Sequence, residues 1–123
     1  MKKLYAALAP LLLIPVFSLG YLGYLSSSCE KLSSAFEKVS VNAENENAEA
    51  QFFEAEKNWE KFEKIFAVSV NHTELDSVKQ GISRAGSYLE SGDLTELKCE
   101  LNLVVKLIEH IKELEYPNLR NIF

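Results

Sequence analysis

The sequence has few of the residues that build catalytic or metal sites. It contains two histidines, His72 and His110, and two cysteines, Cys29 and Cys99. It also lacks a phosphate-binding glycine loop, a dinucleotide fingerprint, a nucleophile motif and the paired histidines of a zinc protease. We therefore expect a protein that is not an enzyme, with no catalytic residue, no cofactor and no bound metal.

Two cysteines are too few for a disulfide scaffold. A bridge between Cys29 and Cys99 is chemically permitted outside the cytoplasm. Cys99 equally suits a small apolar position on a helix. The sequence leaves open whether the two cysteines pair.

Charge is absent from residues 4–25, whereas Lys2 and Lys3 precede this stretch and all 18 acidic residues follow it. A helix crosses the hydrocarbon core of a bilayer with about 20 residues, so the stretch is long enough. Pro10 and Pro15 are tolerated in membrane helices and predict a kink. The lysines in front favour a cytoplasmic N-terminus. We predict a single-pass cell-membrane protein that contacts the bilayer through residues 4–25, with a signal anchor in residues 1–28.

Two alternatives remain for this leader. Ser26, Ser27 and Ser28 are small enough for a signal-peptidase site, although the apolar stretch exceeds the 7 to 15 residues, roughly, of a secretory signal. Lipidation of Cys29 is the other alternative, with Ser26 standing where a large aliphatic residue is expected. All three interpretations place residues 29–123 outside the cytoplasm.

Residues 29–123 have the length of one small domain. They carry all 18 acidic residues and lack two of the 13 basic ones, Lys2 and Lys3, so the domain is acidic. Nucleic acid and anionic lipid headgroups are unsuitable partners for such a surface. A basic or neutral protein partner suits it better.

Apolar residues recur at helical spacing in three long segments of this domain, and none shows sustained strand alternation. A shorter stripe, Leu32, Phe36 and Val39, follows the membrane segment. The long stripes are Phe52, Ala55, Trp59, Phe62 and Phe66, then Leu75, Val78, Ile82, Ala85 and Leu89, then Leu94, Leu97, Leu101, Val104, Ile108 and Ile111. We predict an all-α fold: one transmembrane helix followed by an antiparallel bundle of three to four helices, with Trp59 in its core.

Polar residues mark the helix ends. Thr73, with Asp76 three positions later, predicts a capping box at a helix start. Gly92 predicts a left-handed helix end, and Asp93 the cap of the next helix. Residues 42–47 are polar and predict a loop, and Pro117 predicts the end of the last helix, followed by a tail that folds back.

His72, Glu74 and Asp76 form the tightest group of possible ligands or switch residues, and His110 lies between two glutamates. The simpler interpretation is that His72 belongs to the turn and helix cap, and that His110 hydrogen-bonds a carboxylate. We keep these four as candidate interaction or switch positions, because imidazoles titrate near neutral pH.

The chain resembles a bacterial family, domain-of-unknown-function family 4363, in the order of its motifs. These are the Met-Lys-Lys start with its membrane segment, Trp59, the run His72-Thr73-Glu74-Leu75-Asp76, Arg84, the run Leu107-Ile108-Glu109-His110-Ile111, and the closing Leu119-Arg120-Asn121-Ile122-Phe123. The resemblance covers essentially the whole chain. It implies an anchored, extracytoplasmic, helical protein and brings no catalytic residue with it.

We therefore expect a non-catalytic interaction or scaffolding module of the bacterial cell envelope, which holds an envelope protein against its acidic helical faces. The alternative function is a small-ligand or pH-responsive sensor around His72 and His110. One membrane span with almost no cytoplasmic residues leaves such a sensor without an output domain.

Overall fold

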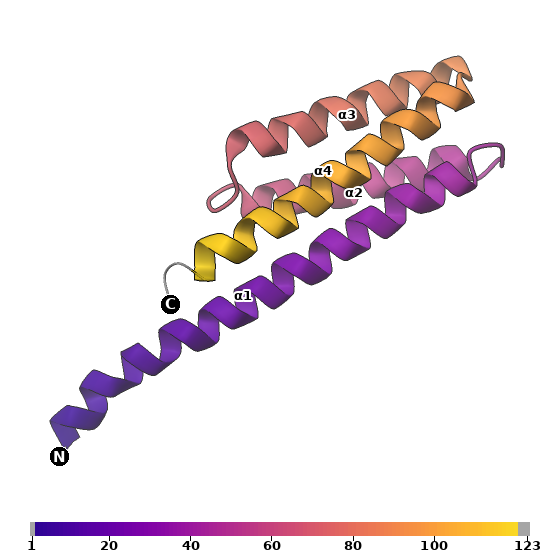
Figure 1. Cartoon of the computed structure of the whole chain (residues 1–123). Helices are drawn as coiled ribbons and strands as arrows, with labels where there is room; N and C mark the ends of the chain where they lie inside the picture. Colours follow the sequence, from indigo (N-terminus) through magenta and orange to yellow (C-terminus); the bar gives the residue numbers. More distant parts are fainter. Residues whose placement is uncertain (1, 121–123) are drawn as a thin grey trace.

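The computed structural model describes residues 2–120, with side chains at residues 6, 8, 9 and 11–115. Its four helices are α1 (Lys2–Val41), α2 (Ala48–Phe66), α3 (His72–Ser91) and α4 (Leu94–Arg120). No strand occurs among residues 2–120. The predicted all-α class is confirmed, and the bundle consists of the C-terminal half of α1 with the three helices that follow (Figure 1).

α1 is one helix of 40 residues that contains Pro10 and Pro15 and continues past residue 28. It alone among the described helices is long and apolar enough to cross a membrane. Its N-terminal half extends beyond the other helices (Figure 1), and the exposed fractions of Leu12, Phe17 and Leu19 are 69%, 72% and 70%. Packing against the bundle begins at Tyr21 and Leu25, inside the stretch predicted to lie in the bilayer. The predicted division of the chain at residue 28 stays a prediction.

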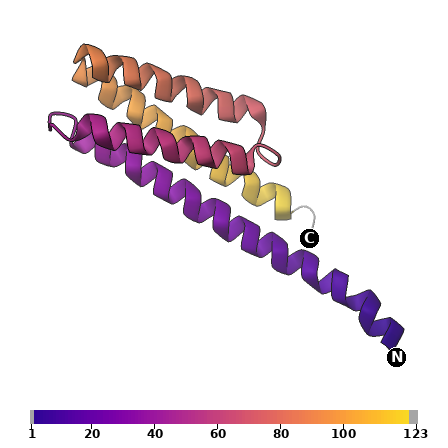
Figure 2. The ribbon, with the colours of Figure 1, turned by 180° about the vertical axis from the view of Figure 1, so that it is seen from behind.

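α4 is the centre of the bundle, because it packs closely against both α1 and α3. α2 lies along the C-terminal half of α1 (Figure 2), and the pair α2 and α3 makes the fewest close contacts of the four neighbouring pairs. The predicted stripes face inward, and burying each large apolar side chain stabilises the fold by roughly 1.5–3 kcal/mol. The fully buried side chains include Phe36 and Val39 of α1, Trp59 and Phe66 of α2, Val78 of α3, and Leu97, Leu101, Val104 and Ile108 of α4.

Gly81 sets the distance between α3 and α4. A Cβ atom added at Gly81 would lie 2.8 Å from Cγ2 of Val104, which is closer than real Cβ contacts. The two helices approach this closely only because the position has no side chain. Outside this seam, Arg84 Nε donates to Glu100 Oε1 at 2.7 Å.

The connection between α3 and α4 agrees with its prediction. Gly92 has a φ of 80°, its N–H donates to the Leu89 carbonyl, and the Asp93 N–H donates to the Tyr88 carbonyl at 3.0 Å. Asp93 Oδ1 then accepts from the Glu96 N–H at 3.3 Å and caps α4. The predicted loop at residues 42–47 is also confirmed.

Two predicted helix ends were wrong. α3 is capped by Asn71, whose Oδ1 accepts from the Thr73 N–H at 2.9 Å, so Thr73 lies inside the helix. Asn is as good a helix cap as Thr, and because Asn71 precedes Thr73 the helix starts two residues earlier than predicted. At the other end of the chain, α4 passes Pro117 and reaches Arg120. Pro117 has no N–H and therefore removes one i to i−4 hydrogen bond, but the helix continues for three residues beyond it. Residues 121–123 of the predicted tail lie outside the described residues.

Candidate functional site

A groove of about 750 Å³ lies between α2 and α3. It forms because this helix pair is packed less closely than the others. Its lining comes from one face of each helix: Phe52, Glu56, Trp59, Glu60, Glu63, Lys64 and Ala67 from the α2 side, and Lys79, Ile82, Ser83, Gly86, Ser87 and Glu90 from α3.

The floor of the groove is apolar and partly aromatic. Trp59 is only 2% exposed and stacks on Phe62, with ring centroids 5.4 Å apart and an interplanar angle of 25°. A Cβ atom added at Gly86 would lie 3.3 Å from the Phe52 ring, so α2 and α3 touch there. The small side chains Ser83 and Ser87 flank Gly86 and keep the groove open.

Trp59 carries an unpaired polar atom at this floor. Its indole Nε1 is buried and has no hydrogen-bond partner among the described residues. A buried N–H donor without an acceptor costs about 1–3 kcal/mol.

The rims of the groove are charged. Four carboxylates, those of Glu56, Glu60, Glu63 and Glu90, face two ammonium groups, those of Lys64 and Lys79. The groove therefore has a net negative lining around an apolar floor. It suits a ligand that combines apolar groups with positive charge.

The predicted residues His72 and Glu74 share a different hollow, of about 500 Å³, at the turn between α2 and α3. The other walls include Val68, Leu114 and Glu115. Burial raises the pKa of the Glu115 carboxyl.

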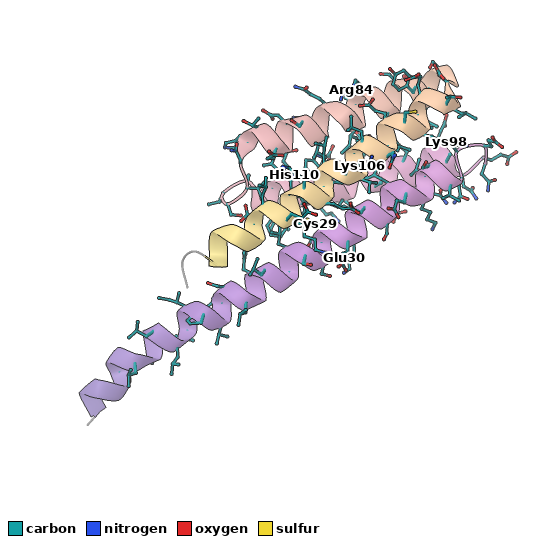
Figure 3. All side chains as sticks on the ribbon, in the orientation of Figure 1. Cys29, Glu30, Arg84, Lys98, Lys106 and His110 are labelled. Atoms are coloured by element: carbon teal, nitrogen blue, oxygen red, sulfur yellow. The ribbon has the colours of Figure 1, made fainter. Side chains whose placement is uncertain are left out.

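Asp76 is exposed on α3, and His110 is exposed on α4 (Figure 3). Neither residue lines the hollow that contains His72 and Glu74. The structure thus brings two of the four predicted residues together and leaves the two histidines apart. Among the residues it describes, no three His, Cys, Asp or Glu side chains are grouped so as to hold a metal ion.

The two cysteines are free thiols at different places. Cys29 is buried on α1 beside Glu30 and Lys112, which are joined by an ion pair of 3.0 Å (Figure 3). Cys99 is exposed on α4 in a hollow that it shares with Val41 and Leu101. The pairing that the sequence left open is not present in this structure.

The groove between α2 and α3 was missed by sequence reasoning. Helical periodicity correctly identified Trp59 and Ile82 as inward-facing, but it cannot tell how closely two inward faces approach. The available signal was Ser83, Gly86 and Ser87, small residues on the face of α3 toward the aromatic stripe of α2.

The sequence model of one protein family, described as a domain of unknown function (DUF4363), matches residues 19–122 of the chain. The match covers the last turns of the apolar half of α1 and nearly all of the bundle. No curated protein and no solved structure matches the chain.

Proposed function

Because the chain belongs to the family DUF4363, whose description names no activity, we propose a function from the fold. The protein is a non-catalytic, membrane-anchored interaction module. α1 holds it in the cell membrane, and its extracytoplasmic bundle binds a protein of the cell envelope in the groove between α2 and α3.

The exposed apolar half of α1 supports the membrane anchor. Each Leu, Ile, Val or Phe contributes about −0.3 to −0.6 kcal/mol near the bilayer centre, and such residues dominate residues 11–19. Tyr5 and Tyr24 are 19 positions apart in the sequence, or about 29 Å along a helix. That distance equals the thickness of the hydrocarbon core, about 30 Å, and tyrosines prefer its two boundaries. Lys2 and Lys3 favour the cytoplasmic side for the N-terminus.

The apolar floor of the groove at Trp59, between rims with a net negative charge, is the observation that carries the binding proposal. A groove between helices accepts an amphipathic helix, whose apolar side chains fill the floor. Lysines or arginines on the flanks of that helix would meet Glu56, Glu60 and Glu63 of α2. The partner segment is therefore apolar on one face and basic at its edges.

Photo-crosslinking in native membranes tests this proposal. A photoreactive amino acid at Ser83 or Ser87, both exposed at the groove, should give one adduct of the same mass. Lys106, exposed on α4, is the control position and should give none. The charge reversals Glu60→Lys and Glu63→Lys together should abolish the adduct. An adduct that survives them, or that forms equally from Lys106, contradicts the proposal, as does the absence of any adduct.

A defined peptide tests the chemistry separately, because Trp59 is the single tryptophan of the chain. A helical peptide of leucine and lysine, added to the full chain in phosphatidylcholine nanodiscs, should change the Trp59 emission. High salt should reverse the change, since charge contacts at the rims are screened. A leucine and glutamate peptide of equal length is the control, and an equal response to both peptides would exclude charge selection.

The orientation has a built-in reporter. Cys99 is exposed and Cys29 is buried, so a membrane-impermeant maleimide on intact cells should label the protein through Cys99. Cys99→Ser should remove the label. Labelling of Cys99 that requires cell lysis would place the bundle in the cytoplasm and refute the proposed topology.

A further inference from the structure

The turn between α2 and α3 is held against α1 close to the end of the exposed apolar half. The Tyr21 and Phe66 rings meet edge to face with centroids 5.6 Å apart, and the Tyr24 and Phe66 centroids are 5.5 Å apart. The hydroxyl groups of Tyr21 and Ser69 are hydrogen-bonded. The turn therefore lies at the level of residues 21–24 of α1.

This end of the bundle exposes apolar side chains. Val68, beside Ser69 in the turn, is 97% exposed, the largest exposed fraction among the large apolar residues of the described chain. Ile65 and Leu114 are also exposed. In an isolated water-soluble domain such a turn tip would normally carry polar residues.

The opposite end of the bundle is polar. The loop between α1 and α2 exposes Glu44, Asn45, Glu46 and Asn47, and Val41 is the large apolar residue exposed beside it. Figure 1 shows that this loop lies at the end of α1 farthest from its N-terminus, whereas α4 ends beside the middle of α1. The two ends of the bundle thus present different surfaces along the axis of α1.

The spacing of Tyr5 and Tyr24 on α1 gives an estimate of the depth at which the apolar end of the bundle would lie in the bilayer. If Tyr5 and Tyr24 mark the two boundaries of the hydrocarbon core, then Tyr21 lies just inside the outer boundary and its partner Ser69 lies at the same depth. Leu19, 70% exposed, is two residues deeper, or about 3 Å along the helix. Val68, adjacent to Ser69 in the chain, then lies near the depth of the exposed Leu19.

We propose that the apolar end of the bundle, formed by Val68, Ile65 and Leu114, rests in the outer interface of the bilayer with Val68 inserted among the lipids. This inference depends on the membrane anchor of the proposed function and is independent of the groove. The contact needs no anionic lipid, because the charged residues that share a hollow with Val68 and Leu114 are Glu74 and Glu115, and Lys64 precedes Ile65 in the sequence. A zwitterionic bilayer is therefore a sufficient partner.

Depth-dependent quenching measures this contact. In a Cys99→Ser background, in which buried Cys29 is the only native thiol, single cysteines at Val68, Phe17 and Val41 carry a fluorescent label. The full chain is reconstituted in phosphatidylcholine vesicles with nitroxides either near the headgroup or at the end of the acyl chain. The label at 68 should be quenched more by the shallow nitroxide, the label at 17 more by the deep one, and the label at 41 by neither.

The three positions separate the possible failures. If the label at 68 is as little quenched as the label at 41 while the label at 17 is deeply quenched, the bundle stands clear of the bilayer and the inference is wrong, although the anchor holds. If the label at 17 is also unquenched, the membrane anchor fails and the inference fails with it.

A charge insertion provides a second readout that does not place a label on the turn tip. Val68→Asp should reduce shallow quenching of a label at Ile65, whereas Val41→Asp at the opposite end should leave it unchanged. Equal quenching in both variants would contradict insertion of Val68. Far-UV circular dichroism of each variant confirms that the helices are retained.

Discussion

The two faces of α3 differ in how closely they meet their neighbours. Toward α4, Gly81 brings the backbones together until no methyl group fits between Gly81 and Val104. Toward α2, the helix leaves a groove with a charged rim and with Trp59 at its floor. The face of α3 toward α4 is fully used in packing the fold, whereas the face toward α2 leaves side chains free to contact a partner.

Because the two faces of α3 differ, we expect one to contribute mainly to stability and the other to binding. The contacts of α4 with α1 and α3 bury side chains that are 0% exposed, among them Leu101, Val104 and Ile108. The groove side contributes less packing because α2 and α3 make fewer close contacts. At positions of equal size, a substitution in the packed contacts of α4 should therefore cost more stability than one in the groove, whereas a substitution in the groove should also change binding.

The largest expected effect is that of Leu101→Ala in the centre of α4. Removing a fully buried leucine side chain from a closely packed site costs about 3–5 kcal/mol. For a domain of this size, that lowers the melting temperature by at least about 12 °C. Ile82→Ala, at the groove, is the matched variant, and its cost should be nearer to about 2 kcal/mol because water can enter there. Thermal unfolding of the full chain in detergent micelles, followed by circular dichroism, measures both. Equal costs would mean that Ile82 at the groove is packed as closely as Leu101 of α4.

The sharpest contrast is between two glycines of the same helix. Gly81→Ala forces a methyl group against Val104, whose fully buried β-branched side chain cannot move away easily. The clash should lower the free energy of unfolding by about 1–2 kcal/mol, after allowance for the better helix propensity of alanine. Gly86→Ala meets the Phe52 ring at 3.3 Å, where the open groove lets the ring move, so it should be neutral or stabilising by up to about 1 kcal/mol. The same melting experiment compares them, and the same sign for both would contradict the difference between the faces.

A smaller effect is expected for the ion pair outside the seam. Arg84→Gln removes the contact with Glu100; the Arg84 side chain is 49% exposed and the Glu100 side chain 14%, so solvent screens the pair in part. The cost should be about 0.2–1 kcal/mol and should decrease at high salt. Lys79→Gln, on the groove side of α3, is the control and should not alter the melting temperature.

The smallest effect on stability is expected for Trp59→Phe. The loss of indole volume is offset by removal of the unpaired N–H, whose burial costs about 1–3 kcal/mol. The melting temperature should therefore change by only a few degrees, corresponding to less than about 1 kcal/mol. The photo-crosslink from Ser83 should nevertheless weaken. A loss of stability comparable to that of Leu101→Ala would show that the indole N–H already has a partner within the folded chain.

Much of the fold was predictable because it depends on local chemistry. The stripe containing Phe52, Trp59 and Phe66 specifies a helix and its buried face without reference to the rest of the chain. Gly92 followed by Asp93 likewise specifies a helix end and the next cap. The uncharged stretch before residue 26 identifies the apolar half of α1 by length alone.

What the sequence did not predict depended on a choice between similar residues or on the spacing of helices. Asn71 and Thr73 both qualify as caps, and it is Asn71 whose Oδ1 accepts from the Thr73 N–H. The close approach of Gly81 to Val104 joins α3 to α4, and periodicity cannot reveal such a contact between helices. The groove could not be predicted either, because it reflects the spacing of α2 and α3.

The unbroken course of α1 has a mechanical consequence. A helix of 40 residues is about 60 Å long, and it enters the bundle core from Leu25 to Val39 without a hinge. Rotation or tilt of its N-terminal half, which we propose lies in the bilayer, would therefore turn the bundle with it. In a membrane, the thickness of the bilayer would then set the direction in which the α2/α3 groove points.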